Sequence, residues 1–297
     1  MKAVRNGAAD LELLKRAYRN DTAWDWRTGP VASVFPYISH PVHDRIVRAI
    51  REHGTEDSFP KGAYITPPDA PIDRIVLVLS GLVARQAGSE TGPIGLAPVG
   101  RFACGHLNFF TRHPAIGSYY ALVPARVASL SQKRFRRLLE EDPELMRTFA
   151  LQCELCTLSD RYGLATLSLL RVRERICAFL IAWARTFGRI AKTSTADTGW
   201  FILPRLPVDI ACRVVNSTPE YADRVLGPWT KEGLALQHGT EFAVHSSVLL
   251  PTFAWLTRMR GGTRMHLPDL FLETAFSIPE ESPAPRWLPA RVSEPRP

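Results

Sequence analysis

The segment from Leu206 to Leu236 constrains the fold most, because it predicts two short helices joined by a tight turn. The first helix is expected over residues 208–215 and the turn at residues 216–217. Thr218 is a favourable N-cap for the second helix, and Pro219 suits its first position because proline has no N–H to leave unpaired. One face of this second helix is apolar and consists of Ala222, Val225, Leu226 and Trp229.

Two interpretations of this helix pair are open. An ordinary helical hairpin of this size occurs in many proteins. A helix-turn-helix, in contrast, presents the N-terminal part of its second helix to base edges in the major groove of DNA. The pair by itself does not decide between them, and the rest of the chain is needed.

Charge and composition fit a nucleic-acid partner without requiring one. The net charge is +8, from 37 Lys and Arg against 29 Asp and Glu, and such a surplus releases counterions from phosphates. We expect a cytoplasmic protein, because no run reaches the ~20 apolar residues of a membrane helix and the N-terminus has no apolar signal region. The 5 cysteines have no framework spacing, which argues against a secreted disulfide scaffold.

The segments before the helix pair predict a β-domain followed by a long helix. Short β-rich runs separated by Gly and Pro begin at Phe59 and are typical of a small sandwich or barrel. A helix opening at Pro143 after the N-cap Asp142 extends to about residue 168 and has an apolar stripe of Leu145, Phe149, Cys153, Cys156 and Leu164. One small domain cannot cover that much apolar surface, so we expect pairing with a second copy.

Five stretches in this order resemble the Crp/Fnr family of bacterial transcription regulators. They are IVLVLSGLVA (75–84), GRFACGHLNFF (100–110), LSQKRFRRLLEEDPELMRTFA (130–150), RVRERICAFLIAWA (171–184), and DIACRVVNSTPEYADRVL (209–226) followed by KEGLAL (231–236). The resemblance implies an α+β fold with an N-terminal antiparallel β-roll like a cyclic-nucleotide-binding domain, a long dimerisation helix and a C-terminal winged helix-turn-helix. The implied organisation is an irregular leader (1–40), the β-roll (41–140), the dimerisation helix (141–170), the DNA-binding domain (171–250) and a C-terminal extension (251–297) that is disordered from about residue 277.

The resemblance also assigns DNA-contacting residues. The family's second helix carries a Glu and a later Arg that read bases, and these fall on Glu220 and Arg224. The Arg that usually precedes the Glu is replaced by Pro219. Further expected contacts are Ser217, Thr218 and Tyr221 to phosphates or bases, and Arg205 and Arg213 along the backbone. The alternatives are a solvated surface arginine at Arg224 and a Glu220 that only favours the helix N-terminus.

The pair Gly227-Pro228 departs from the family pattern. Proline inside a helix removes a hydrogen bond and clashes with the preceding turn, at a cost of ~3 kcal/mol. We therefore expect the second helix to stop or kink near Leu226, which puts the presentation of Arg224 in doubt.

Cyclic AMP is not expected to control this chain. His106 stands where cyclic-AMP-binding members carry a Glu, and Ile116 or Gly117 stands where they carry an Arg. A buried phosphate without a cationic partner is costly. If the β-roll binds another small-molecule effector, its pocket is expected at Gly105, His106, Leu107, Ile116, Gly117 and Ser118.

Cysteines offer two further possibilities, each with a simpler alternative. Cys153 and Cys156 form C-x-x-C on the long helix, where two copies could hold a metal or respond to oxidation. Cys104 with His106 could ligate haem or metal. Small apolar residues in a core explain both pairs more simply. No cluster of cysteines precedes Cys104, which argues against an iron–sulfur sensor, and no cofactor or metal is predicted.

The chain contains none of the common hydrolase, nucleotide-binding or zinc-protease motifs, so an enzyme is not predicted. The hypothesis that fits best is a homodimeric, sequence-specific transcription regulator on palindromic double-stranded DNA, with RNA polymerase and an unidentified effector as further candidate partners. The alternative, motivated by Pro219 and Gly227-Pro228, is an effector-binding or scaffolding β-roll protein whose helix-turn-helix has lost DNA binding.

Overall fold

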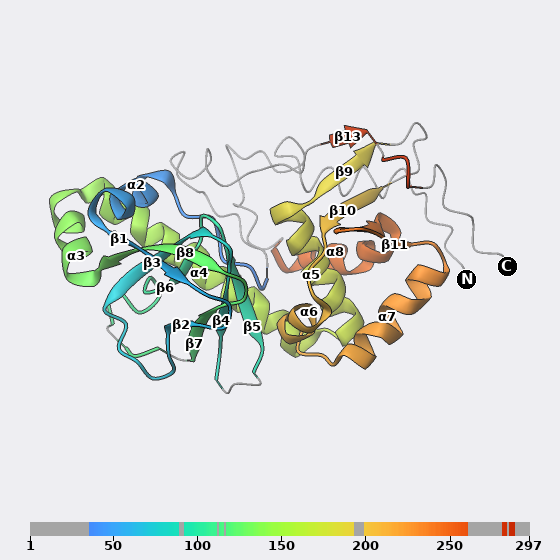
Figure 1. The fold of residues 1–297 in the computed structure, drawn as a ribbon, viewed down its shortest axis with the longest axis horizontal. Helices are drawn as coiled ribbons and strands as arrows, with labels where there is room; N and C mark the ends of the chain where they lie inside the picture. Colours follow the sequence, from blue (N-terminus) through green and yellow to red (C-terminus); the bar gives the residue numbers. More distant parts are fainter. Residues whose placement is uncertain are drawn as a thin grey trace. The chain divides into compact units, whose positions relative to one another are not determined.

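The computed structural model describes residues 36–88, 92–111, 113–115, 117–192, 199–260, 281–283 and 285–288 (Figure 1). The chain divides into two compact units. The N-terminal unit holds the described residues from 36 to 168, and the C-terminal unit holds those from 169 onward. Most of the predicted leader, residues 1–35, lies outside the described residues.

The N-terminal unit contains two four-stranded antiparallel sheets, ordered β1-β8-β3-β6 and β2-β7-β4-β5. The strands are β1 (Thr55–Phe59), β2 (Tyr64–Thr66), β3 (Arg74–Ser80), β4 (Leu82–Gln86), β5 (Ile94–Pro98), β6 (Phe102–Cys104), β7 (Ser118–Ala121) and β8 (Ala125–Ser131). Gly81 joins β3 to β4 with a φ of +85°, and a Cβ there would meet the Pro124 carbonyl. Only glycine suits this corner, which passes the chain from one sheet to the other.

Two apolar clusters stabilise this unit. Small and β-branched residues from both sheets form the first cluster: Ile65, Val76, Val78, Val83, Ala97, Ala103, Cys104, Ala121, Ala125 and Val127. In the second cluster, helices α2 (Asp44–His53), α3 (Gln132–Glu141) and α4 (Pro143–Leu169) pack on the β1-β8-β3-β6 sheet. Its centre is aromatic, and the Phe149 ring lies 4.9 Å from that of Phe109 and 5.0 Å from that of Phe135, measured between centroids.

Helix α4 begins where the sequence predicts. A carboxylate oxygen of Asp142 accepts hydrogen bonds from the backbone N–H groups of Glu144 and Leu145, each at 3.1 Å. Of the predicted apolar stripe, Leu145, Phe149 and Cys156 are buried within the unit, Cys153 is half-buried and Leu164 is 63% exposed.

A five-stranded sheet, ordered β11-β12-β10-β9-β13, organises the C-terminal unit. Its strands are β9 (Arg189–Lys192), β10 (Trp200–Pro204), β11 (Ala235–His238), β12 (Glu241–His245) and β13 (Glu281–Pro283). The helices are α5 (Val172–Phe187), α6 (Val208–Val214), α7 (Pro219–Lys231) and α8 (Ser246–Arg260), and α5 packs against α8 (Figure 1). No described helix has the length and apolarity needed to cross a membrane.

Residues 281–283 and 285–288 of the C-terminal extension contribute to this unit. Strand β13 pairs in parallel with β9, Leu288 is buried with Trp200 and Ile202, and the Trp287 ring stacks on His238 with centroids 5.1 Å apart. The prediction of disorder from about residue 277 is therefore wrong for residues 281–283 and 285–288. Burial of two apolar side chains on the sheet offsets the entropy of ordering a proline-rich segment.

Candidate nucleic-acid interface

The turn between α6 and α7 is held from two sides. Asn216 takes a positive φ of 51°, a conformation that asparagine tolerates better than most residues. The Ser217 N–H donates to the Cys212 carbonyl at 2.9 Å. From α5, the Arg175 guanidinium donates to the carbonyls of Val215 and Asn216 at 3.3 and 3.4 Å. The predicted turn is therefore confirmed, and α5 fixes it in place.

Helix α7 begins as its cap residues predict. The Thr218 hydroxyl accepts from the Tyr221 N–H at 3.3 Å, and Pro219 occupies the first turn. Its predicted apolar face is confirmed, with Ala222, Val225 and Trp229 buried and Leu226 half-buried. The Arg173 guanidinium lies over the Trp229 ring, 5.8 Å from its centroid, and adds a cation–π contact.

Polar side chains occupy the outward surface of the first two turns of α7. Glu220 and Arg224 are exposed, and Tyr221 is 44% exposed. The Thr218 hydroxyl, the backbone at the helix start and the Arg224 charge hold the pKa of Glu220 below its usual range. Glu220 is therefore a carboxylate at neutral pH and an acceptor for an amine donor. Residues 217–224 thus present one cation, Arg224, two anions, Glu220 and Asp223, and hydroxyls at one end of one helix.

Helix α7 does not stop near Leu226, so that part of the prediction is wrong. It continues through Gly227 and Pro228 to Lys231. Pro228 forfeits one backbone hydrogen bond, but burial of Trp229 in the next position favours continued helix. Arg224 is consequently carried on an unbroken helix.

A β-hairpin of β11 and β12 follows α7 and forms the wing. His238 pairs with Glu241, and Gly239 turns the chain with a φ of 55°. At the tip of this hairpin the Arg205 N–H donates to the Thr240 carbonyl at 2.8 Å, and Arg205 is exposed. Arg213 is half-buried on α6. The predicted contacts thus come from α7, from α6 and from the segment that precedes α6.

The predicted effector residues of the β-roll have tight surroundings. His106 is 2% exposed and stacks on Phe102 with centroids 4.8 Å apart, and burial together with the Arg85 charge holds the pKa of His106 well below 6.5. A Cβ on Gly105 or Gly117 would meet a backbone carbonyl of the neighbouring strand. Leu107 is 37% exposed, Ser118 is buried, and Ile116 lies outside the described residues.

Sequence reasoning missed Arg85, a buried cation of the N-terminal unit. Its side chain is 10% exposed, and the guanidinium donates to the Ser39 hydroxyl and to an Asp160 carboxylate oxygen, each at 2.7 Å. Burial alone would lower the pKa of Arg85, but the Asp160 carboxylate more than compensates and raises it. The available signal was an arginine that directly follows three apolar residues in strand β4.

The five cysteines are all free. Burial raises the pKa of Cys104 and of Cys156 to about 11 each, so both are protonated thiols at neutral pH and poor nucleophiles or ligands in that form. Cys104 bonds the Thr66 hydroxyl at 3.4 Å, and Cys153 donates to the His106 carbonyl at 3.4 Å. Within the described ranges, no three His, Cys, Asp or Glu side chains gather as a metal site would require.

The architecture defines a class of protein: a β-roll with a long helix, followed by a winged helix-turn-helix. No family model matches the chain, and no curated protein matches it in sequence. Among solved structures it is similar to TTHA1359, a transcriptional regulator of the CRP/FNR family from Thermus thermophilus, with 22% identity, 71% of this chain and 100% of that chain covered, and a TM-score of 0.50.

Two other solved structures agree. FixK2 from Bradyrhizobium japonicum is 15% identical, covers 64% of this chain and 92% of its own, and has a TM-score of 0.53. The regulator CLP from Xanthomonas campestris, described as responsive to c-di-GMP, is 20% identical, covers 68% and 98%, and also has a TM-score of 0.53. The predicted α+β fold of Crp/Fnr regulators is therefore confirmed.

Proposed function

We propose that this chain is a homodimeric, sequence-specific DNA-binding transcription regulator of Crp/Fnr type that acts without cyclic AMP. The observation that carries the proposal is the exposed N-terminal end of α7, where Thr218, Glu220 and Arg224 project from a helix whose other face is buried. Such an end enters the major groove in helix-turn-helix proteins.

The side chains at this end match base edges. Arg224 is exposed and suits bidentate binding to guanine O6 and N7, and ionised Glu220 suits the cytosine amine. Ser217 and Tyr221 flank them within reach of phosphates. Net charge of +8 supports the electrostatic part of DNA affinity.

A second copy of the chain is proposed to pack along α4. Leu151, Leu158 and Ala165 follow a seven-residue spacing and are only half-buried, and Leu164 nearby is 63% exposed. A heptad of this kind forms a helix–helix seam when a partner covers it. Leu158→Glu should yield monomers in sedimentation equilibrium, whereas Lys133→Glu, at an exposed position of α3, should leave the dimer intact.

Independence from cyclic AMP follows from the β-roll. His106 is a buried, neutral ring that packs on Phe102, and the charge of Arg85 is already neutralised by Asp160 at 2.7 Å. A cyclic phosphate entering there would have to compete with that carboxylate for the cation. Displacing the carboxylate from this largely buried cation is costly.

The experiment that tests the proposal is selection of bound sequences from a random duplex pool, with purified full-length protein and no added nucleotide. A palindrome with half-sites about one helical turn apart is expected. Adding cyclic AMP should change neither the motif nor the affinity. Failure to enrich any motif, with and without cell extract, would indicate a protein that no longer binds DNA through α7.

A further inference from the structure

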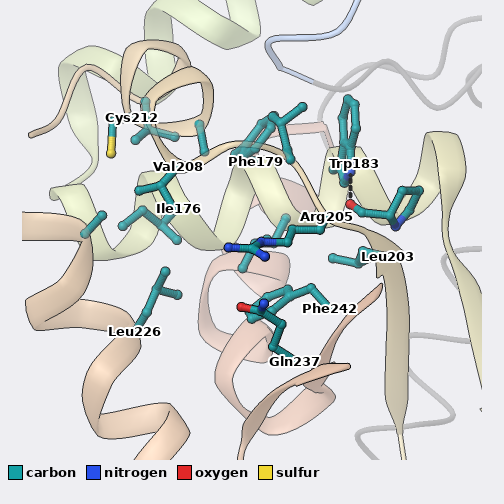
Figure 2. A pocket seen from close by; sticks show the side chains of 16 residues that line it. Ile176, Phe179, Trp183, Leu203, Arg205, Val208, Cys212, Leu226, Gln237 and Phe242 are labelled. Carbon is teal, nitrogen blue, oxygen red and sulfur yellow. Dashed lines mark hydrogen bonds between the residues drawn. The ribbon is translucent and has the colours of Figure 1, made fainter. Parts of the chain in front are cut away.

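A mostly apolar pocket lies within the C-terminal unit, between α5, α6, α7 and the wing hairpin. Its volume is about 140 Å³, and its walls include Phe179, Trp183, Leu226 and Phe242 (Figure 2). The polar side chains on its lining are Arg205 and Gln237, which reach in from the rim (Figure 2). The pocket is separate from the effector residues predicted in the β-roll, because all of its lining residues belong to the C-terminal unit.

Hydrogen bonds fix the positions of the elements that form the walls of this pocket. The Trp183 indole N–H donates to the Pro204 carbonyl at 2.9 Å, which fixes α5 against the end of β10. The Arg205 N–H donates to the Thr240 carbonyl at 2.8 Å, which fixes the next residue against the hairpin. A closed apolar cavity of ~150 Å³ accepts a benzene-sized molecule, so the volume of this pocket is sufficient for one aromatic ring.

Arg205 sets the chemistry of the rim. Among the described residues, its guanidinium has no carboxylate or other acceptor at hydrogen-bond distance, although its stem lies along the apolar wall. A guanidinium beside an apolar surface binds carboxylates well, because two parallel N–H groups match the two oxygens. One cation matches one negative charge, and the pocket behind it accepts the apolar body of the same molecule.

We propose that this pocket binds a small monocarboxylate with an aromatic or branched aliphatic body of about six carbons, with the carboxylate on Arg205. A regulatory consequence rests on the proposed function. Arg205 is also an expected DNA-backbone contact, and α6 and α7 form two walls of the pocket. A bound carboxylate therefore competes with phosphate for Arg205 and weakens DNA binding.

The probe for this proposal is 4-fluorobenzoate, observed by ¹⁹F NMR with the full-length protein. Saturable broadening or shift of its resonance is expected, and benzoate should reverse it. The uncharged 4-fluorobenzyl alcohol should bind at least about tenfold more weakly, because it loses the charge-assisted pair with Arg205. This comparison uses the unaltered protein and does not depend on any variant folding.

Two variants locate the site. Ala211→Leu places a larger side chain on the pocket wall and should abolish binding, while Arg205→Gln should weaken binding of 4-fluorobenzoate about tenfold and leave the alcohol unchanged. Lys231→Gln, exposed at the end of α7 and outside the pocket, is the matched control and should bind as the wild type does. Thermal unfolding checks that each variant is folded.

Three outcomes would each overturn the proposal. They are the absence of a saturable signal, equal binding of the acid and the alcohol, and unchanged binding by a folded Ala211→Leu variant. DNA binding is measured separately on the selected palindrome. If 4-fluorobenzoate binds but no DNA motif exists, the pocket stands and the proposed function fails. If the protein binds a DNA motif but not 4-fluorobenzoate, the proposed function stands and the pocket proposal fails.

Discussion

The Arg85 guanidinium lies 2.7 Å from an Asp160 carboxylate oxygen and so joins strand β4 to helix α4 across 75 residues of sequence. The two partners differ in exposure: the Arg85 side chain is 10% exposed and that of Asp160 is 37% exposed. Removing the Asp160 carboxylate therefore leaves the Arg85 cation buried and without its ionic partner. Removing the Arg85 cation leaves a carboxylate that water reaches.

This asymmetry predicts unequal costs. Asp160→Asn should lower the free energy of unfolding by about 1–3 kcal/mol, a range that allows for solvent screening of the half-exposed carboxylate. Arg85→Met should cost less, and the double variant should be no worse than Arg85→Met alone. Urea unfolding checks this. Glu56→Gln, which breaks the exposed pair with Arg126, is the control and should cost little. Equal losses in both single variants would contradict the asymmetry.

His106 predicts a loss of stability in mild acid. Its pKa in the folded protein is held well below 6.5, first by burial and then by the Arg85 charge. The unfolded chain takes up the proton first as pH falls below 6.5, so stability is fully present above that pH and is lost as pH falls toward the folded pKa.

The measurement is the urea midpoint from about pH 7 down to about pH 5. The wild type should lose more stability over this interval than His106→Gln, which cannot titrate. The two proteins are compared by how much the urea midpoint changes with pH. Their absolute midpoints also differ, because the substitution changes the packing against Phe102. Parallel curves for the two proteins would show that His106 does not contribute.

Arg224 predicts a loss of specificity. Arg224→Ala should weaken binding to the selected palindrome by about 1–3 kcal/mol and relax discrimination at one base position in each half-site. Lys231→Ala, at the far end of the same helix, should leave the preferred base at that position unchanged. A uniform loss across all sequences would instead identify Arg224 as a phosphate contact.

Two glycines predict opposite responses to alanine. At Gly227 in α7 a Cβ would meet nothing within 4 Å, so Gly227→Ala should stabilise the protein by about 0.5–1 kcal/mol. At Gly117, φ is +103° and a Cβ would meet the Gln86 carbonyl, so Gly117→Ala should destabilise it by more than that. Thermal unfolding of both variants tests the pair, and stabilisation by Gly117→Ala would contradict the described turn.

Local signals predicted the helix starts correctly. Thr218-Pro219 and Asp142-Pro143 each combine a capping side chain with a proline that needs no partner for its nitrogen, and both helices begin there. Such signals act over three or four residues, so tertiary structure is not required to interpret them. The turn at Asn216 and the apolar face of α7 were predictable for the same reason.

The sequence by itself indicated a β-domain, a long helix and then a helix-turn-helix that carries Glu220 and Arg224, together with the likeness in fold to Crp/Fnr regulators. Tertiary structure decided the rest. Packing around Trp229 carries α7 past Pro228, β9 pairs with β13 at residues 281–283, and Arg85 meets Asp160. The pocket at Arg205 is assembled from helices and strands that are far apart in the sequence. Each of these features depends on contacts between distant residues, whose energy no local pattern specifies.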